Sequence, residues 1–385
     1  MAMGRHSSQG EIAEWVFGAK GPTSSPLQAL VAGCGTGDGA IMRATHLARA
    51  ERPGQVICVD RSHAALEIAR NRAQARKLDN IRFVQGDLTE LPALGLGTFD
   101  YIDCCGVLHH LPNPDAVLAL LAAQLNPGGG MGLMVYAPYG RTGVYMLQDA
   151  LETLAPITQP PQERLDTARR IIRTLPATAW LHQNGNFGDH LSGGDAGLYD
   201  LLLNPRDQAY TITDFLVFLD RAGLEPAALM EPARYNPALF LPDPKLRQRL
   251  ATLPWQQQAA IAEDLCGNMA THVAYVVRKG QAVTRPDPLN PDSVPIMREI
   301  PGAELAKQMR PDNTLPFAFG TLVVPIALPS QARGILPLID GVRTVGEIEA
   351  ILSTRGVNAQ KFKQVWTESF HSLEQLNRVL LRPPA

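Results

Sequence analysis

The sequence has few cysteines, no surplus of either charge and no long apolar run, and each shortage excludes a class of protein. Its 385 residues hold 35 Lys and Arg against 37 Asp and Glu, a formal net charge of −2, so no strong nucleic-acid binding is expected. The longest apolar stretches, 116–125 and 321–329, are about half of the ~20 residues that a membrane span requires. Positions 1–10 are polar and lack the apolar core of a signal peptide, which predicts a cytoplasmic protein.

The spacing of the cysteines excludes two further classes. They stand at positions 34, 58, 104, 105 and 266, and no two of them form a C-x-x-C pair. This is the pattern neither of a disulfide framework nor of a thiolate metal site. Buried, reduced thiols are therefore expected, and no metal is predicted.

About the first 135 residues alternate short apolar runs with helical patterns, which is typical of a parallel sheet with crossover helices. The predicted strands are 27–32, 56–59, 81–84, 101–104 and 131–136, and the predicted helices are 40–50, 64–75 and 114–125. The pattern predicts the α/β fold class, with a doubly wound sheet.

The alternation stops at position 138, and residues 138–207 have helical and loop-like patterns. Beyond them we expect a helix at 213–222, a strand at 225–230, helices within 244–266 and a last strand at 272–277. This ending predicts an antiparallel strand at the edge of the sheet. We expect the insert 138–207 to form a helical lid above the carboxyl ends of the strands, where ligands bind in open α/β sheets.

The remainder of the chain predicts a second, smaller domain. Residues 281–300 contain four prolines and little apolar periodicity, which indicates a linker or a strapped surface segment after a first domain of residues 1–280. Residues 301–385 have an apolar pattern of their own and are predicted to form a separate α+β domain.

The strongest motif is the run Gly33–Gly39, with the sequence G-C-G-T-G-D-G, between a predicted strand and a predicted helix. Glycine at 33, 35 and 37 allows a tight turn that a ligand can approach closely, and the helix start offers N–H groups to an anion. A dinucleotide-binding loop would have a third glycine where Asp38 stands. A pyrophosphate would be repelled by that carboxylate, whereas a sulfonium cofactor carries no phosphate.

Acidic residues follow the next two predicted strands. Asp60 ends the second strand, where a carboxylate accepts hydrogen bonds from ribose hydroxyls, and Asp87 ends the third, where it can accept from an adenine amino group. The fourth strand leads into the run Cys105–Leu111, which contains a Leu-His-His sequence.

Residues 27–136, with these motifs, resemble the class I S-adenosylmethionine-dependent methyltransferases. The resemblance extends over residues 10–280 and implies a Rossmann-like, seven-stranded sheet and S-adenosyl-L-methionine as the cofactor. It implies that cofactor-binding residues are Gly33, Cys34, Gly35, Gly37, Asp60, Arg61, Asp87, Leu88, Cys105, Gly106 and Val107.

Catalytic candidates lie after the fourth and fifth strands. Methyl transfer mainly requires that the acceptor atom is held in line and that water is excluded, and a general base only if the acceptor arrives protonated. The resemblance suggests His109 beside the acceptor, and Tyr139, Arg141 and Tyr145 are placed to wall a pocket and bind an anionic group. Plain alternatives are that His109 packs against the loop after it and that 136–145 is an ordinary turn.

The C-terminal segment 334–348 reads as a helix, an Asp-Gly turn and a second helix, which begins with the capping box Thr344-x-x-Glu347. It resembles the winged-helix modules at the C-termini of some protein methyltransferases and the PqqD-like peptide-binding modules, which favours protein or peptide recognition or a homodimer.

The sequence thus predicts an S-adenosylmethionine-dependent methyltransferase. It does not identify the acceptor, and the C-terminal module favours a protein or peptide. The alternatives are a small-molecule methyltransferase with a closed lid pocket, a non-catalytic cofactor-binding partner subunit, and a nicotinamide oxidoreductase.

Overall fold

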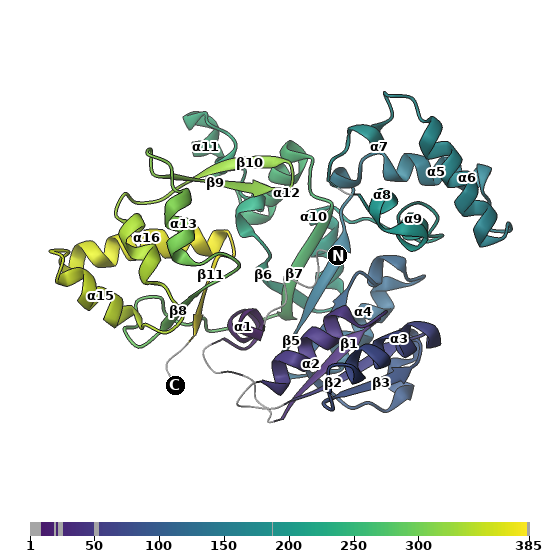
Figure 1. Ribbon diagram of the computed structural model, residues 1–385, viewed down its shortest axis with the longest axis horizontal. Helices are drawn as coiled ribbons and strands as arrows, with labels where there is room; N and C mark the ends of the chain where they lie inside the picture. Colours follow the sequence, from purple (N-terminus) through teal and green to yellow (C-terminus); the bar gives the residue numbers. More distant parts are fainter. Residues whose placement is uncertain (1–8, 19–20, 22–25, 50–53, 187, 383–385) are drawn as a thin grey trace.

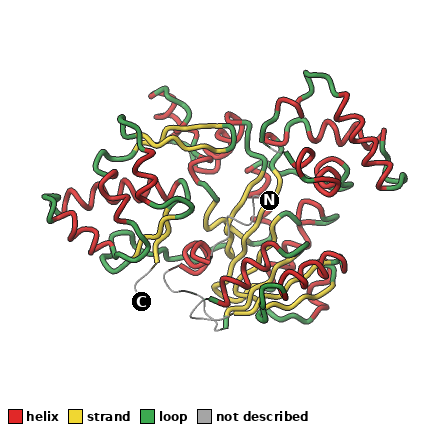
Figure 2. The backbone as a smooth tube through the Cα atoms, in the orientation of Figure 1, coloured by secondary structure: helices red, strands yellow, loops and turns green. Residues whose placement is uncertain are grey.

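The computed structural model describes residues 9–18, 21, 26–49, 54–186 and 188–382. Positions 1–8 of the polar N-terminus and Ala50, the last residue of the first predicted helix, lie outside these ranges. The described chain forms a twisted sheet with helices on both faces, a helical insert and a C-terminal unit (Figures 1 and 2). No helix within those ranges has the length and apolar character needed to cross a membrane.

The central sheet has seven strands in the order β3-β2-β1-β4-β5-β7-β6, which confirms the predicted α/β class. Its strands are β1 (Leu27–Ala32), β2 (Gly54–Asp60), β3 (Ile81–Gln85), β4 (Phe99–Cys105), β5 (Leu125–Tyr136), β6 (Leu224–Leu229) and β7 (Thr271–Arg278). The first five strands are parallel, and β7 is antiparallel to both β5 and β6. The predicted antiparallel edge is therefore wrong in one respect: β7 lies between β5 and β6, and β6 is the edge strand.

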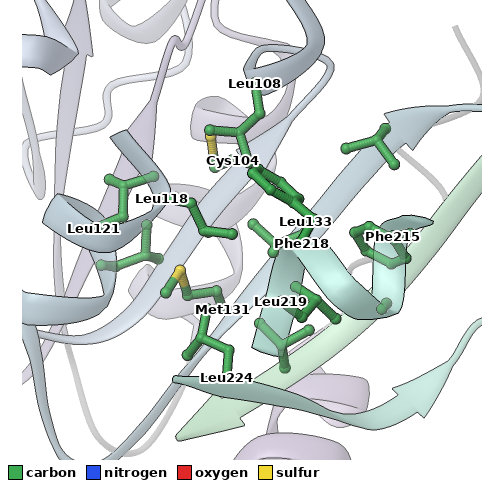
Figure 3. Packing of buried hydrophobic residues seen from close by; sticks show 14 of the residues in the cluster. Cys104, Leu108, Leu118, Leu121, Met131, Leu133, Phe215, Phe218, Leu219 and Leu224 are labelled. Atoms are coloured by element: carbon green, nitrogen blue, oxygen red, sulfur yellow. The ribbon is translucent and has the colours of Figure 1, made fainter. Parts of the chain in front are cut away.

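Neighbouring residues of β1 alternate between the two faces of the sheet. Ala29 and Val31 pack with α2 (Asp38–Ala48) and α3 (His63–Gln74), while Leu30 and Ala32 join the larger cluster on the other face. That cluster includes α4 (Pro114–Ala123), α10 (Ile212–Arg221) and α12 (Trp255–Cys266). Figure 3 shows its centre, where the labelled side chains of α4 and α10 pack on those of β4 and β5. Burial on both faces explains why the strands read as nearly continuous apolar runs.

Local signals explain where the crossover helices begin. Ser62 accepts a hydrogen bond from the Ala65 N–H at the start of α3, and Asn113 accepts one from the Ala116 N–H at the start of α4. A capping box of Thr211 and Asp214 begins α10. Polar side chains before an apolar stripe thus fix the helix ends, and the stripe then packs on the sheet.

The insert follows directly after the carboxyl end of β5. It contains 3₁₀-helix η6 (Tyr139–Arg141) and helices α5 (Val144–Leu154), α6 (Pro161–Thr174), α7 (Trp180–Gln183), α8 (Asp189–Ser192) and α9 (Gly194–Leu202). The helices enclose a small apolar cluster of their own, which includes Val144, Leu151, Leu165, Leu198 and Leu202. Figure 1 shows the insert standing beside the sheet rather than flat on one of its faces.

The C-terminal unit begins earlier than the predicted linker allows. Strand β8 (Val294–Met297) lies inside the 281–300 segment and pairs antiparallel with β11 (Val379–Arg382). The unit also contains the hairpin of β9 (Thr314–Phe319) and β10 (Leu322–Ala327) and helices α13 (Gly302–Gln308), α14 (Ala332–Ile335), α15 (Val345–Ser353) and α16 (Ala359–Gln375). These elements share one apolar core around Trp366, whose indole N–H donates to the Pro288 carbonyl at 2.7 Å. The prolines of the segment therefore strap a strand into this core, and the winged-helix resemblance stays a prediction.

The N-terminal segment joins the C-terminal unit to the sheet. It consists of α1 (Gln9–Ile12) and a π-helical turn, η2 (Ala13–Phe17). Glu11 pairs with Arg298 at 2.7 Å, and Glu14 pairs with Arg285 and accepts a hydrogen bond from the Leu381 N–H. Both carboxylates are buried, so the attachment between the two parts is a packed, ion-paired contact.

Candidate active site

The glycine loop between β1 and α2 brings bare backbone to the edge of the sheet. Gly33, Gly35 and Gly37 all have positive φ, the left-handed region that other residues rarely adopt. The Gly33 N–H donates to the Val59 carbonyl at 2.8 Å, and a Cβ at Gly33 would lie 2.5 Å from a methyl of Val107. A Cβ at Gly35 would meet nothing within 4 Å. The turn therefore needs glycine, and at Gly35 it leaves open space for a ligand.

Two side chains hold this loop from opposite sides. The Asp60 carboxylate, at the end of β2, accepts a hydrogen bond from the Gly35 N–H at 2.8 Å. Arg72, on α3, donates to the Thr36 carbonyl at 2.8 Å and forms an ion pair with Asp38. The loop is thus preorganised, and the predicted ribose ligand Asp60 also positions the loop itself.

The third strand ends at the same edge. Asp87 is exposed and accepts hydrogen bonds from the N–H and the hydroxyl of Thr89, which hold the pKa of Asp87 below its usual value. It caps the 3₁₀-helix η4 (Leu88–Leu94), and Leu88 itself is buried. Arg61 is exposed beside Asp60. Each of these predicted residues lies at the carboxyl end of its strand.

A cavity of about 650 Å³ opens next to the glycine loop and runs over the sheet from β1 to β7. Its walls combine loop backbone with side chains of α2, β4, β5 and β7, and no lysine or arginine is among them in the described part of the chain. The lining residues are Val31–Gly39, Met42, Tyr101, Asp103, Cys105, Gly132, Met134, Val273, Ala274 and Tyr275.

One lining residue, Asp103, belongs to a buried ion pair that the sequence did not predict. Arg43 Nη2 lies 2.8 Å from Asp103 Oδ2, and both side chains are buried. The Arg43 guanidinium also lies 4.5 Å from the centroid of the Tyr101 ring. The sequence signal that could have revealed it is an aspartate between Ile102 and Cys104 in a predicted strand, because a buried carboxylate needs a partner.

The catalytic candidates lie elsewhere, in a cluster that we call the insert junction: His109, Tyr136, Arg141, Tyr145, Gln148 and Asp207. Arg141 Nη2 pairs with Asp207 at 3.0 Å, and its Nε donates to the Tyr145 hydroxyl at 3.0 Å. Its guanidinium lies 3.7 Å from the centroid of the Tyr136 ring. Gln148 donates to the same Asp207 oxygen. The cluster joins β5 to the two ends of the insert.

His109 packs on the other side of this cluster. Its ring lies 3.9 Å from the Tyr136 ring, centroid to centroid, and the residue is 1% exposed. Within the described residues, neither ring nitrogen has a hydrogen-bond partner. Burial, with His110 and Arg141 nearby, lowers the pKa of His109 to about 2. The imidazole is therefore neutral at physiological pH and a weak base.

The structure separates the predicted residues into two groups. Of the cofactor candidates, Gly33, Cys34, Gly35, Gly37 and Cys105 line the cavity. Val107 packs on Gly33, and Gly106 donates its N–H to the Met134 carbonyl.

The catalytic candidates form the second group. His109, Arg141 and Tyr145 belong to the insert junction, and Tyr139 is exposed. None of the four is among the described residues that line the cavity, and Arg141 is already paired with Asp207. Their catalytic role therefore stays a prediction. Nothing in the sequence indicated the contact between Arg141 and Asp207, because the two residues are 66 positions apart.

Comparison with known proteins identifies part of the chain. Residues 29–129 match a family model described as a methyltransferase domain. An uncharacterised protein of Synechococcus sp. is 31% identical over 251 residues, which is 64% of this chain and 58% of that protein. Trans-aconitate 2-methyltransferase of Deinococcus radiodurans is 36% identical over 116 residues, covering 30% of this chain and 40% of the enzyme.

The chain thus spans 58% of the length of the first relative and 40% of the second. Among solved structures, PKMT2 from Rickettsia typhi in complex with AdoHcy matches 97% of this chain and 75% of its own, with a TM-score of 0.68 and 16% sequence identity. The likeness is one of fold, and it extends to the insert and the C-terminal unit.

Proposed function

We propose that this protein, whose residues 29–129 form a methyltransferase domain within the seven-stranded fold of the S-adenosylmethionine-dependent methyltransferases, transfers a methyl group from that cofactor to a protein or peptide. The observation that carries the proposal is the cavity beside the glycine loop. It is walled by loop backbone, by apolar and aromatic side chains and by the carboxylates of Asp38 and Asp103, and the described lining residues include no basic side chain.

This lining fits S-adenosylmethionine better than a dinucleotide. A pyrophosphate would be expected to meet N–H donors with a basic or neutral surround, whereas Asp38 follows the third motif glycine here. A sulfonium compound brings a positive charge, which carboxylates favour. Asp60 and Asp87 stand at adjacent strand ends, where they would accept hydrogen bonds from the ribose and the adenine amino group.

When bound, the cofactor would supply a methyl group on a cationic sulfur, which is already a good leaving group. The chain's contribution is then to orient the acceptor and exclude water. Gly33 and Gly35 would let the cofactor approach the backbone, and the insert stands after β5, at the carboxyl edge that an acceptor must reach. His109 is not among the described residues that line the cavity, and its lowered pKa makes it a weak base. The acceptor would therefore have to lose its proton to water or to another group.

The insert surface supports a polypeptide acceptor. It exposes several large apolar side chains, which could contact a polypeptide. These side chains are Met146, Leu154, Ile157, Trp180 and Leu191. The fold shared with a protein named PKMT2 covers 97% of this chain and so includes the insert and the C-terminal unit. Trans-aconitate 2-methyltransferase matches only 30% of this chain.

A small acceptor is the second candidate. Trans-aconitate 2-methyltransferase and a ubiquinone biosynthesis O-methyltransferase, whose names indicate small acceptors, match 30% and 25% of this chain. The cavity of about 650 Å³ also has room for more than the cofactor's amino-acid end.

Incubation with methyl-labelled cofactor and a cell extract tests the proposal. We expect label in the protein or peptide fraction, and none with a Gly33→Ala variant, whose loop is obstructed by Val107. Label confined to small molecules would favour the second candidate. No transfer to any fraction, with cofactor binding retained, would identify a non-catalytic binding subunit.

A further inference from the structure

The cavity beside the glycine loop has a buried carboxylate, Asp103, in its wall. In the parallel pairing of β1 and β4, Asp103 is the register partner of Val31, two residues before Gly33. Both residues line the cavity, so the carboxylate lies on the same wall as the start of the loop. A ligand that occupies the loop and continues into the cavity must pass this group.

Asp103 lines the cavity, and its charged and polar neighbours include Arg43 and the Cys105 thiol. Arg43 binds Oδ2 at 2.8 Å from the α2 side. The neighbouring hydroxyl of Tyr275 donates to Glu11, and the Cys105 thiol donates weakly to the Gly132 carbonyl at 3.6 Å. Burial raises the pKa of Cys105, so its thiol stays neutral. Asp103 is thus the anionic group in an otherwise neutral part of the lining.

Asp38, the other carboxylate of the lining, is not equivalent. It is exposed at the mouth, at the first position of α2, and is paired with Arg72. Charges that water can reach contribute little to binding, whereas a desolvated carboxylate forms stronger hydrogen bonds with a cation. The buried group is therefore the one that can select a positively charged ligand atom.

We propose that Asp103, held by Arg43, binds the α-ammonium at the amino-acid end of the cofactor. The inference rests on the proposed function, because it assumes that an adenosyl amino acid occupies the glycine loop. The chemistry is complementary: an ammonium presents three N–H donors, and the carboxylate offers acceptor positions that Arg43 does not use. Arg43 keeps the buried carboxylate in place and compensates its charge in the unliganded protein.

Calorimetric titration of two ligands separates this role from a structural one. S-Adenosylhomocysteine contains the amino-acid end, and 5′-methylthioadenosine lacks it. In Asp103→Asn we expect the Kd for S-adenosylhomocysteine to rise roughly tenfold or more, the loss expected for a hydrogen bond to a charged group. The Kd for methylthioadenosine should stay within about twofold, because that ligand does not reach Asp103.

Asp100→Asn is the matched control. Asp100 is a buried carboxylate on the same strand, it accepts from the Gln28 N–H and the Asn126 side chain, and it is not among the described lining residues. Its replacement should affect the two ligands equally. Equal weakening of both ligands by Asp103→Asn would show a structural role and overturn the inference.

A measurement on the unaltered protein covers the case in which Asp103→Asn does not fold. The wild type should bind S-adenosylhomocysteine at least about tenfold more tightly than its deaminated analogue, which lacks only the ammonium. Equal affinity for the two would overturn the inference while leaving the proposed function intact. Failure of the wild type to bind S-adenosylhomocysteine at all would overturn the proposed function itself, and the inference with it.

Discussion

At the β1 and β2 end of the sheet's carboxyl edge, backbone groups face an open cavity, whereas at the β5 end charged and aromatic side chains are sealed together under the insert. The glycine loop owes its shape to residues without side chains and to Asp60, which holds the Gly35 N–H. The insert junction owes its shape to Arg141 and Asp207, a buried pair that joins segments far apart in the chain.

The difference indicates how the two tasks are divided. A cofactor of constant structure can be bound by backbone geometry, which tolerates little substitution. In the proposed function, the acceptor side would depend on the helical insert, which is docked through side chains that can change without disturbing the sheet. The four predictions below test the two ends separately.

The largest effect is expected at the insert junction. Asp207→Ala leaves the buried guanidinium of Arg141 without its carboxylate, which should reduce the free energy of unfolding by about 3–5 kcal/mol. Urea unfolding followed by circular dichroism measures this change. Asp195→Ala, which removes the exposed partner of Arg169, should leave the midpoint unaltered, and equal shifts in both variants would contradict the account.

At the glycine-loop end, Gly33→Ala should weaken cofactor binding by about 3 kcal/mol or abolish it. The new Cβ would lie 2.5 Å from Val107, and the positive φ adds strain. Titration calorimetry with S-adenosylhomocysteine gives the Kd. Gly334→Ala, which adds the same methyl group in open space within the C-terminal unit, should bind like the wild type.

Much of the glycine-loop end could be predicted from the sequence, because its signals are local. The G-C-G-T-G run lies next to its strand, and Asp60 ends the next strand along the chain. The insert junction could not be predicted, because no local pattern shows which of several aspartates meets Arg141. The pairing of β8 with β11 could not be predicted either, because the two strands stand at opposite ends of the C-terminal unit in the sequence. The prolines around β8 suggested a linker instead.

A smaller effect should follow the loss of Asp60. Asp60→Ala removes the acceptor of the Gly35 N–H and the proposed ribose contact, which should weaken S-adenosylhomocysteine binding by ~1–3 kcal/mol. Asp79→Ala, which removes an exposed carboxylate before β3, is the control. Unchanged affinity in Asp60→Ala would place the ligand elsewhere on this edge.

The smallest effect is a pH dependence from the insert junction. The pKa of His109 is lowered in the folded protein, so between pH 6.5 and about 4.5 the unfolded chain takes up a proton that the folded chain does not. Stability should therefore fall as the pH is lowered, by roughly 1 kcal/mol for each pH unit from this residue. His109→Phe keeps a ring against Tyr136, and its free energy of unfolding should depend less on pH than that of the wild type. Urea unfolding at about pH 7.5, 5.5 and 4.5 measures this dependence. An identical slope in the variant would mean that His109 is protonated in the folded state.

Competitive titration calorimetry of S-adenosylhomocysteine and NADH tests the central claim most directly, since both compounds suit glycine loops of related folds. We expect S-adenosylhomocysteine to bind the wild-type chain, and we expect saturating NADH to leave the Kd of S-adenosylhomocysteine unaltered. Binding of NADH in its place, or displacement of one compound by the other, would contradict the assignment of this cavity to a methyl donor.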